Sequence, residues 1–205
     1  MFSLERILRR DAAEIHDEFN YDMRSNKGPI HWGEVKPEWS QCNNGSMQSP
    51  IHLTNKTIQT LSALGPLQLN YTKTNATFVN RGHDIMLRFN APKNYLKLNG
   101  TQYLLKQCHW HSPAEHTMDG KRFGLEFHMV HQTPSGQTAV LAILYRVSEK
   151  ADAFLELEGS VTREQLRLLQ HPLRHDSKAN ARPVQPLNNR LVQLNLLKDM
   201  VNDKH

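Results

Sequence analysis

Alternating apolar and polar positions between residues 67 and 147 predict a series of short β-strands. Gly, Asn and Pro separate the runs, and the pair Asn99-Gly100 between two of them predicts a tight hairpin. We therefore expect a mixed α/β fold dominated by β-sheet. The predicted strands are Thr77–Asn80, Ile85–Phe89, Tyr95–Leu98, Gln102–His111, Phe123–His131 and Thr138–Val147.

The two ends of the chain follow other patterns. Thr162–Gln170 is typical of a capped amphipathic helix, because a threonine precedes apolar residues at helical spacing. The first residues are rich in charge, and their apolar stripe from Leu4 to Leu8 is short. We therefore expect a poorly ordered arm over residues 1–27 and a single domain over residues 28–205.

Composition and charge exclude two classes of partner. Of the 205 residues 38% are apolar and 22% charged, and no apolar run approaches the roughly 20 residues of a membrane span. The net charge of +5 favours nucleic-acid binding at first sight, but basic and acidic residues are interspersed. The densest basic cluster, Arg6, Arg9 and Arg10, is short and interrupted. We expect neither a nucleic-acid partner nor a membrane span.

Histidine is the compositional signal that points to chemistry. The chain has 12 histidines, and five of them lie between His109 and His131. Residues two apart in a strand share a face, so His109, His111 and Gln107 project together. The same rule places Glu126, His128 and Val130 on one face of the next long strand. Antiparallel pairing of these strands would bring three imidazoles to one point.

Three neutral histidines with an open fourth position are the usual form of a catalytic zinc site. Zinc held in this way lowers the pKa of its water to about 7. Such ligands need partners on their second ring nitrogens, and Gln107 and Glu126 lie on the correct faces to supply them. The alternative is a chance His-x-His strand whose imidazoles are satisfied by backbone groups.

The segment from His109 to His131 resembles the signature of the α-carbonic anhydrases in its plant form. Other blocks of that family occur in the same order, which makes the resemblance specific. It implies a central, mostly antiparallel twisted sheet with short peripheral helices. The further blocks are His31-Trp-Gly, Met47-Gln-Ser-Pro-Ile, Asn80-Arg-Gly-His-Asp and Asn180-Ala-Arg-Pro-Val-Gln-Pro-Leu.

The resemblance also implies a role for each matching position. The zinc ligands would be His109, His111 and His128, with Gln107 and Glu126 behind them. Glu115 would orient the reactive zinc hydroxide, His83 would carry the released proton to buffer, and His116 would be a structural polar residue. Val130 and Val140 would line the wall where carbon dioxide sits. Taken alone, His83 fits a solvated turn histidine, and both valines fit ordinary core positions.

One part of the family pattern is missing. Phe154–Glu158 resembles the beginning of a region that leads, in the family, to a Thr-x-Pro-Pro block, yet Gly159 onward resembles the helix beyond that block. We expect an internal deletion near residues 158–160, caused by splicing or by skipped coding sequence. The lost threonine would orient the zinc hydroxide together with Glu115. Cys42 would lose its disulfide partner, and an incomplete sheet would have unpaired edges.

Two functions remain open. One is zinc-dependent hydration of carbon dioxide to bicarbonate, with doubtful competence in this chain; the other is a non-catalytic storage or binding protein of the same fold. The resemblance implies the secretory pathway or the chloroplast stroma, although the N-terminus lacks the apolar core of a signal peptide. Asn-x-Ser/Thr sequons, which would be acceptors in the secretory pathway, occur at Asn44, Asn55, Asn70, Asn75 and Asn99.

Overall fold

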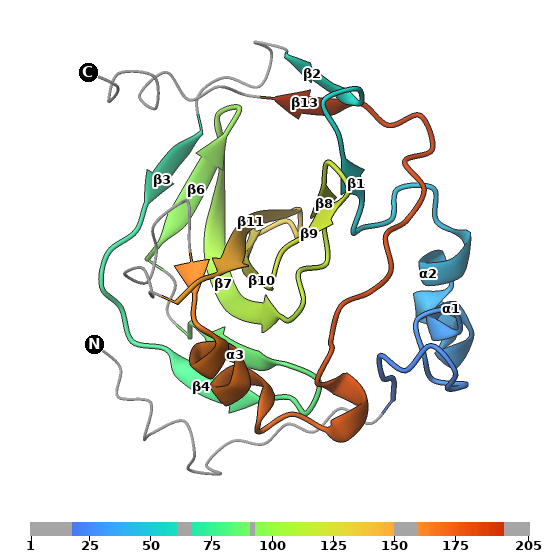
Figure 1. The fold of residues 1–205 in the computed structure, drawn as a ribbon. Helices are drawn as coiled ribbons and strands as arrows, with labels where there is room; N and C mark the ends of the chain where they lie inside the picture. The colour runs from blue at the N-terminus through green and yellow to red at the C-terminus, as the bar shows by residue number, and fades with distance from the viewer. Residues whose placement is uncertain (1–17, 61–66, 91–92, 150–159, 195–205) are drawn as a thin grey trace.

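An eight-stranded sheet dominates the fold (Figure 1). The computed structural model describes residues 18–60, 67–90, 93–149 and 160–194. The sheet order is β12-β11-β10-β7-β5-β4, and β6 pairs with the first half of β7 and with β3. Within this sheet every pairing is antiparallel except that of β11 with β12. The strands are β3 (Gln68–Asn70), β4 (Thr77–Asn80), β5 (Ile85–Arg88), β6 (Tyr95–Leu98), β7 (Thr101–His111), β10 (Leu125–Gln132), β11 (Thr138–Val147) and β12 (Ser160–Val161).

The predicted β-dominated class is confirmed, and each predicted strand matches an observed one within two residues at either end. The hairpin between β6 and β7 turns at Asn99 and Gly100, whose φ angles of 48° and 79° are those of a type I′ turn. The predicted helix is α3 (Arg163–Gln170). Thr162 and Gln165 form its capping box, which explains where the helix begins.

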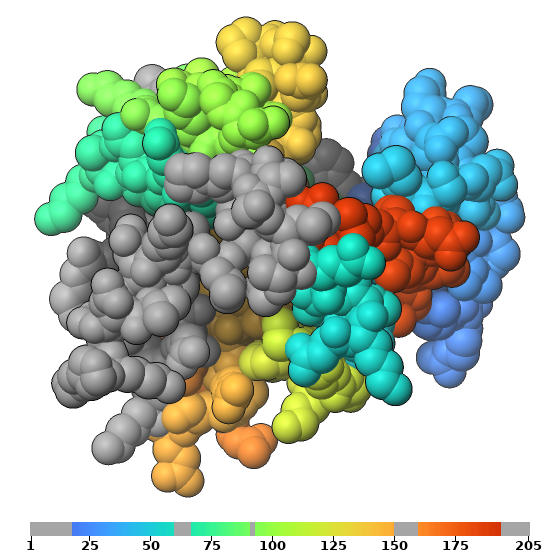
Figure 2. All heavy atoms as spheres, turned by 90° about the horizontal axis from the view of Figure 1, so that it is seen from above, coloured from blue at the N-terminus to red at the C-terminus, as the bar shows by residue number. Residues whose placement is uncertain are grey.

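Shorter elements surround the sheet. The segment between η4 and β13 runs between the helices α1 and α2 and the sheet (Figure 1), and its red atoms lie beside the blue atoms of the helical region in Figure 2. Its backbone bonds to both sides, since Gln185 donates to Pro50 and Asn180 to Ser112. These elements are α1 (Trp32–Val35), η2 (Pro37–Trp39), α2 (Gln41–Asn44), η4 (His175–Ser177), a sheet of β1 (His52–Leu53), β8 (Thr117–Met118) and β9 (Lys121–Arg122), and a pair of β2 (Ile58–Thr60) and β13 (Val192–Leu194).

The apolar core lies on one face of the sheet. Trp110 of β7 stacks on Phe127 of β10 with ring centroids 4.9 Å apart, and α3 adds Leu166 and Leu169 to the cluster. The register between β7 and β10 shifts after Val130, so that the ladder skips one residue of β7. The opposite face of the same strands carries the histidines, because alternate residues point to opposite sides.

The described part of the predicted arm packs against the domain. The Phe19 ring meets the Trp32 ring edge-on at 5.3 Å, and Trp32 Nε1 donates to the Asn20 carbonyl at 3.1 Å. Residues 1–17 of that arm and the predicted deletion point fall outside the described residues, so the domain boundaries stay predictions. Across the described ranges, no helix is long and apolar enough to span a membrane.

Candidate metal centre

Three imidazoles converge on the polar face of β7 and β10. The register places His128 directly opposite His109 and Glu126 opposite His111. Ring centroids are 4.8 to 5.1 Å apart, and one nitrogen of each ring lies within 4.8 Å of the others. His109 Nε2 and His128 Nδ1 are 3.3 Å apart, close to the separation of two nitrogens that bind one tetrahedral zinc ion.

The remaining nitrogen of each ring has a partner of its own. His109 Nδ1 lies 2.8 Å from Gln107 Oε1, and His111 Nδ1 donates to the Asn180 carbonyl at 2.6 Å. Because a carbonyl only accepts, the neutral His111 ring keeps the lone pair on Nε2. His128 Nε2 donates to Glu126 Oε1 at 2.7 Å. Three lone pairs therefore face one point, as a metal site requires.

The Glu126 carboxylate holds this arrangement in place through hydrogen bonds. Glu126 is fully buried, and four donors surround its carboxylate: the backbone N–H groups of Glu115 and His116 on Oε2, and the rings of His116 and His128 on Oε1. Burial raises the pKa of Glu126, but the hydrogen bonds from His116 and His128 outweigh it and bring the pKa well below its usual range. The carboxylate stays ionised, and His116 has the structural contact that the resemblance implies.

The His109 ring is held in its neutral form. Burial is the largest cause that lowers the pKa of His109, and the neighbouring His111 and His128 lower this pKa further. A metal ligand must offer a lone pair, so a strongly lowered pKa favours coordination at neutral pH.

Glu115 lies beside the three imidazoles. Its Oε2 is 3.5 Å from His111 Nε2, and its Oε1 accepts the backbone N–H of Arg182 at 2.9 Å. The Arg182 side chain is buried, bonds to Gln48 Oε1 at 2.7 Å, and lies over the Trp32 ring at 5.5 Å. In the described part of the chain, no serine or threonine hydroxyl bonds to the Glu115 carboxylate.

His83 is buried rather than solvated. Only 6% of the residue is exposed, its Nε2 lies 3.7 Å from Asp84 Oδ2, and the Phe19 ring covers it at a centroid distance of 4.6 Å. The interpretation of His83 as a solvated turn histidine is therefore wrong. Phe19, which lies in the predicted arm, covers His83, and no pattern in the sequence indicates that contact.

The two valines differ in their surroundings. Val130 on β10 is half-buried, whereas its cross-strand neighbour Val140 on β11 is 51% exposed. The interpretation of Val140 as an ordinary core residue is wrong. No described strand lies beyond β11 at this height, so no neighbouring strand shields the Val140 side chain from that direction.

Sequence reasoning did not assign roles to Asn180 and Arg182 individually. Both belong to the block Asn180-Ala-Arg-Pro that carried part of the resemblance, and that block was the available signal. The Asn180 amide donates to the carbonyls of His83 and Trp110 and accepts the Ser112 N–H. These bonds fix the backbone whose carbonyl orients His111.

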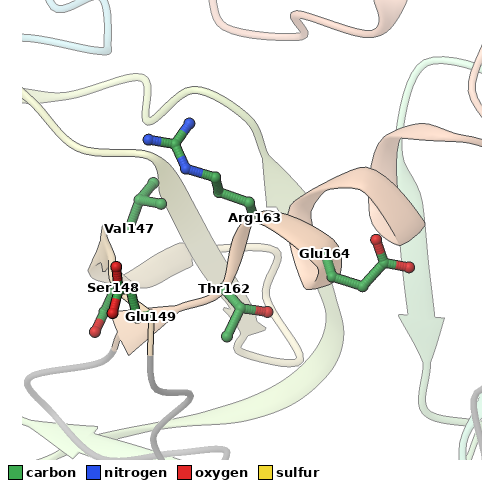
Figure 3. A pocket seen from close by; sticks show the side chains of 6 residues that line it. All are labelled: Val147, Ser148, Glu149, Thr162, Arg163 and Glu164. Atoms are coloured by element: carbon green, nitrogen blue, oxygen red, sulfur yellow. The ribbon is translucent and has the colours of Figure 1, made fainter.

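A cavity of about 380 Å³ lies apart from the imidazoles, where β11 meets β12 and α3 (Figure 3). It carries both acidic and basic groups but no histidine. It contains none of the residues that the sequence predicts for the site. The lining residues are Val147, Ser148, Glu149, Thr162, Arg163 and Glu164.

Comparisons with known proteins converge on one family. A family model described as eukaryotic-type carbonic anhydrase matches residues 27–158. Alpha carbonic anhydrase 7 of Arabidopsis thaliana is 39% identical, over 95% of this chain and 93% of the relative. Alpha carbonic anhydrase 5 of the same plant is 51% identical over 71% of this chain, which spans 53% of that relative. A crystal structure of dioscorin complexed with ascorbate superposes with a TM-score of 0.80 at 30% identity, over 87% of this chain and 99% of that one.

Two of these matches bear on the predicted internal deletion. The alignment with alpha carbonic anhydrase 7 runs over 257 positions, more than the 205 residues of this chain, so part of the relative has no counterpart here. The family match ends at residue 158, at the predicted deletion point. Whether splicing or skipped coding sequence accounts for the difference stays a prediction.

Proposed function

Because the chain belongs to the eukaryotic-type carbonic anhydrase family in its plant form, we propose that it binds zinc through His109, His111 and His128 and catalyses the reversible hydration of carbon dioxide to bicarbonate. The observation that carries the proposal is the set of three inward lone pairs, each fixed by a hydrogen bond on the opposite ring nitrogen. This donor set fits zinc, which favours three neutral imidazoles and an open position.

The chain's own residues would divide the work. When bound, zinc supplies the Lewis acidity that makes water a nucleophile at neutral pH. Gln107 and Glu126 hold the ligand rings in place. Glu115, whose Oε1 accepts the backbone N–H of Arg182, would accept a hydrogen bond from a donor beside His111. Val130 would offer apolar surface to carbon dioxide. His83 would pass the released proton outward, and its burial under Phe19 makes that step slower.

Turnover should be slow in this chain. Glu115 has no hydroxyl partner among the described residues, and Val140, the second proposed wall residue, is half exposed. Orientation of the reacting groups contributes strongly to such a reaction, and a misplacement of about 1 Å can cost about 100-fold in rate. We expect a rate lower by at least that factor than in a full-length relative.

A second function is a zinc-binding protein without turnover, serving storage or the binding of a small molecule. The lack of a hydroxyl at Glu115 in the described part of the chain favours it. Because the solved dioscorin is a complex with ascorbate, ascorbate is a ligand to test. The compartment that we propose for either function is the secretory pathway or the chloroplast stroma.

The decisive experiment combines metal analysis with a stopped-flow pH-indicator assay on the purified chain. Zinc at one equivalent with turnover that His111→Ala abolishes would support the enzyme. Zinc without turnover would support the second function. Absence of zinc from protein that is folded by circular dichroism would contradict both.

A further inference from the structure

The outer edge of β11 has no strand beside it over most of its length in the described part of the chain. On its inner edge β11 pairs with β10 from Thr138 to Tyr145. On its outer edge only Arg146 and Val147 are paired, with β12. Residues 138–145 therefore form an open edge of the large sheet. The strand that carries this edge pairs with β10, which contributes to the candidate metal centre.

The backbone groups that face outward can be identified. The Gly124 N–H donates to the Tyr145 carbonyl at 3.0 Å, so the backbone N–H and C=O groups of Tyr145 point toward the inner edge. Ser148 donates to Val161 and faces the outer edge. Because the backbone N–H and C=O groups of successive residues point to opposite edges of a strand, those of the even-numbered residues point to the outer edge. The outward residues of the open edge are Thr138, Val140, Ala142 and Leu144.

The composition of this edge is that of a covered strand. Residues 138–145 contain no charged residue and no proline, the two features that usually protect an open edge. The side chain of Val140 is exposed, and so is that of Ala142 next to it on the same face. Within the described ranges no strand pairs with these four N–H and four C=O groups, so they and a small apolar surface are open to a partner.

The chain between Glu149 and Ser160 is too short to cover the far half of the edge. In the register that pairs Arg146 with Ser160, the residue beside Val140 would be Phe154. The chain would have to return about 30 Å along the strand from Glu149 to that position, whereas five residues reach about 18 Å. In this register the segment that links Glu149 to Ser160 cannot supply a strand beside Val140, and no described strand lies there.

We propose that β11 pairs antiparallel with β11 of a second copy of this chain, about a two-fold axis at Leu141. In this register Val140 faces Ala142 of the other copy, and Thr138 faces Leu144. Every outward N–H and C=O of the open edge then has a partner. An axis at Ala142 would instead set Thr138 against Arg146, whose edge β12 already occupies.

This pairing closes on itself, so it yields a dimer and not a filament. The two sheets become continuous, and the metal-site faces of both copies lie on the same side. Val140 of each copy then packs beside Ala142 of the other. The dimer uses no metal ligand and does not depend on the proposed catalysis.

The first test measures the mass of the full chain in solution by sedimentation over a broad range of concentrations. We expect a monomer–dimer equilibrium. Ala142→Pro removes an outward N–H without touching the inner ladder, and Val140→Lys places a charge on the edge. Each should raise the dimer dissociation constant at least about tenfold. Met47→Lys, at a side chain exposed elsewhere, should leave it unchanged.

Cross-linking tests the register in a Cys42→Ser background. Leu141→Cys places two sulfurs across the axis, where facing Cα atoms of a non-hydrogen-bonded pair lie about 4.5 Å apart, and should give a disulfide-linked dimer under mild oxidation. Ala139→Cys on the same face is the control, because its two copies would lie about 13 Å apart.

Four results would overturn the proposal. These are a monomer at every concentration, a dimer that both edge variants leave intact, cross-linking at Ala139 as fast as at Leu141, and slow amide exchange at the outward residues of a monomer. The last result would show that the chain covers its own edge. Circular dichroism of each variant confirms that the fold is retained.

Discussion

The strand β10 has two neighbours, and the contacts on its two sides differ in kind. Towards β7 the shared face holds a buried polar network in which Glu126 and the imidazoles satisfy one another. Towards β11 the same face holds Val130, Val140 and Ala142, which are apolar and partly or largely exposed. On one side β10 therefore borders a buried, hydrogen-bonded polar site. On the other side it borders a partly exposed apolar surface.

The difference shows which part of the fold the metal site needs. All three candidate ligands and two of their supporting groups come from β7 and β10, a single antiparallel pair. The site can therefore be geometrically whole although no described strand lies beyond β11 along residues 138–145. We expect metal binding to survive in this chain better than the chemistry that depends on the surroundings of Val140.

The largest effect should follow from removing a ligand on the polar side. His111→Ala eliminates one lone pair and leaves the Asn180 carbonyl without its donor. Zinc affinity should fall by more than the roughly 10–100-fold that loss of a supporting group costs. Competition with a chromophoric chelator measures the affinity. An unchanged affinity would mean that the metal binds elsewhere.

Glu126→Gln should have the next largest effect, because four donors surround that carboxylate. The amide can accept fewer of them, so we expect zinc affinity about 10–100-fold lower and stability lower by about 1–3 kcal/mol. Urea unfolding and chelator competition check the two quantities. The matched control is Glu164→Gln, at an exposed residue paired with Arg167, which should change neither.

Asn180→Ala should act more weakly but on both sides of the site. The variant loses the contacts to His83, Trp110 and Ser112, so the carbonyl that orients His111 becomes less fixed. We expect stability lower by about 1–3 kcal/mol and zinc dissociation faster by about tenfold. If zinc dissociates from this variant at the wild-type rate, the hydrogen bonds of the Asn180 side chain have no part in metal binding.

The smallest effect concerns the core face of the same strands. Burial raises the pKa of the Cys108 thiol to about 12, so at pH 8 it is almost entirely protonated and should not react with a disulfide reagent. Cys42 is half-buried and should react first. Because a raised thiol pKa suppresses the thiolate below it, Cys108 should react only on unfolding. Two equally fast thiols in native protein would contradict the packing.

The strands and the ligand set were predictable because they depend on local rules. Alternation placed His109 and His111 on one face, and Asn99-Gly100 fixed the turn that leads into β7. The convergence with His128 needed one assumption, antiparallel pairing, and the register confirms it.

What could not be predicted involves partners distant in the chain. Asn180 reaches His111 across 69 residues, and no spacing rule relates the two. Phe19 covers His83 from a segment whose charge favoured disorder. The exposure of Val140 depends on which strands lie beyond β11, and alternation says nothing about that.

The long reach of Asn180 also bears on the order of folding. The three candidate ligands lie within a stretch of 20 residues, so a short loop closure brings them together. The contact between Asn180 and His111 closes a much longer loop, which contains α3 and η4, so it has a much higher contact order and should form later. We therefore expect zinc to meet its ligands before the His111 ring is fixed, which makes metal capture an early step and ring orientation a late one.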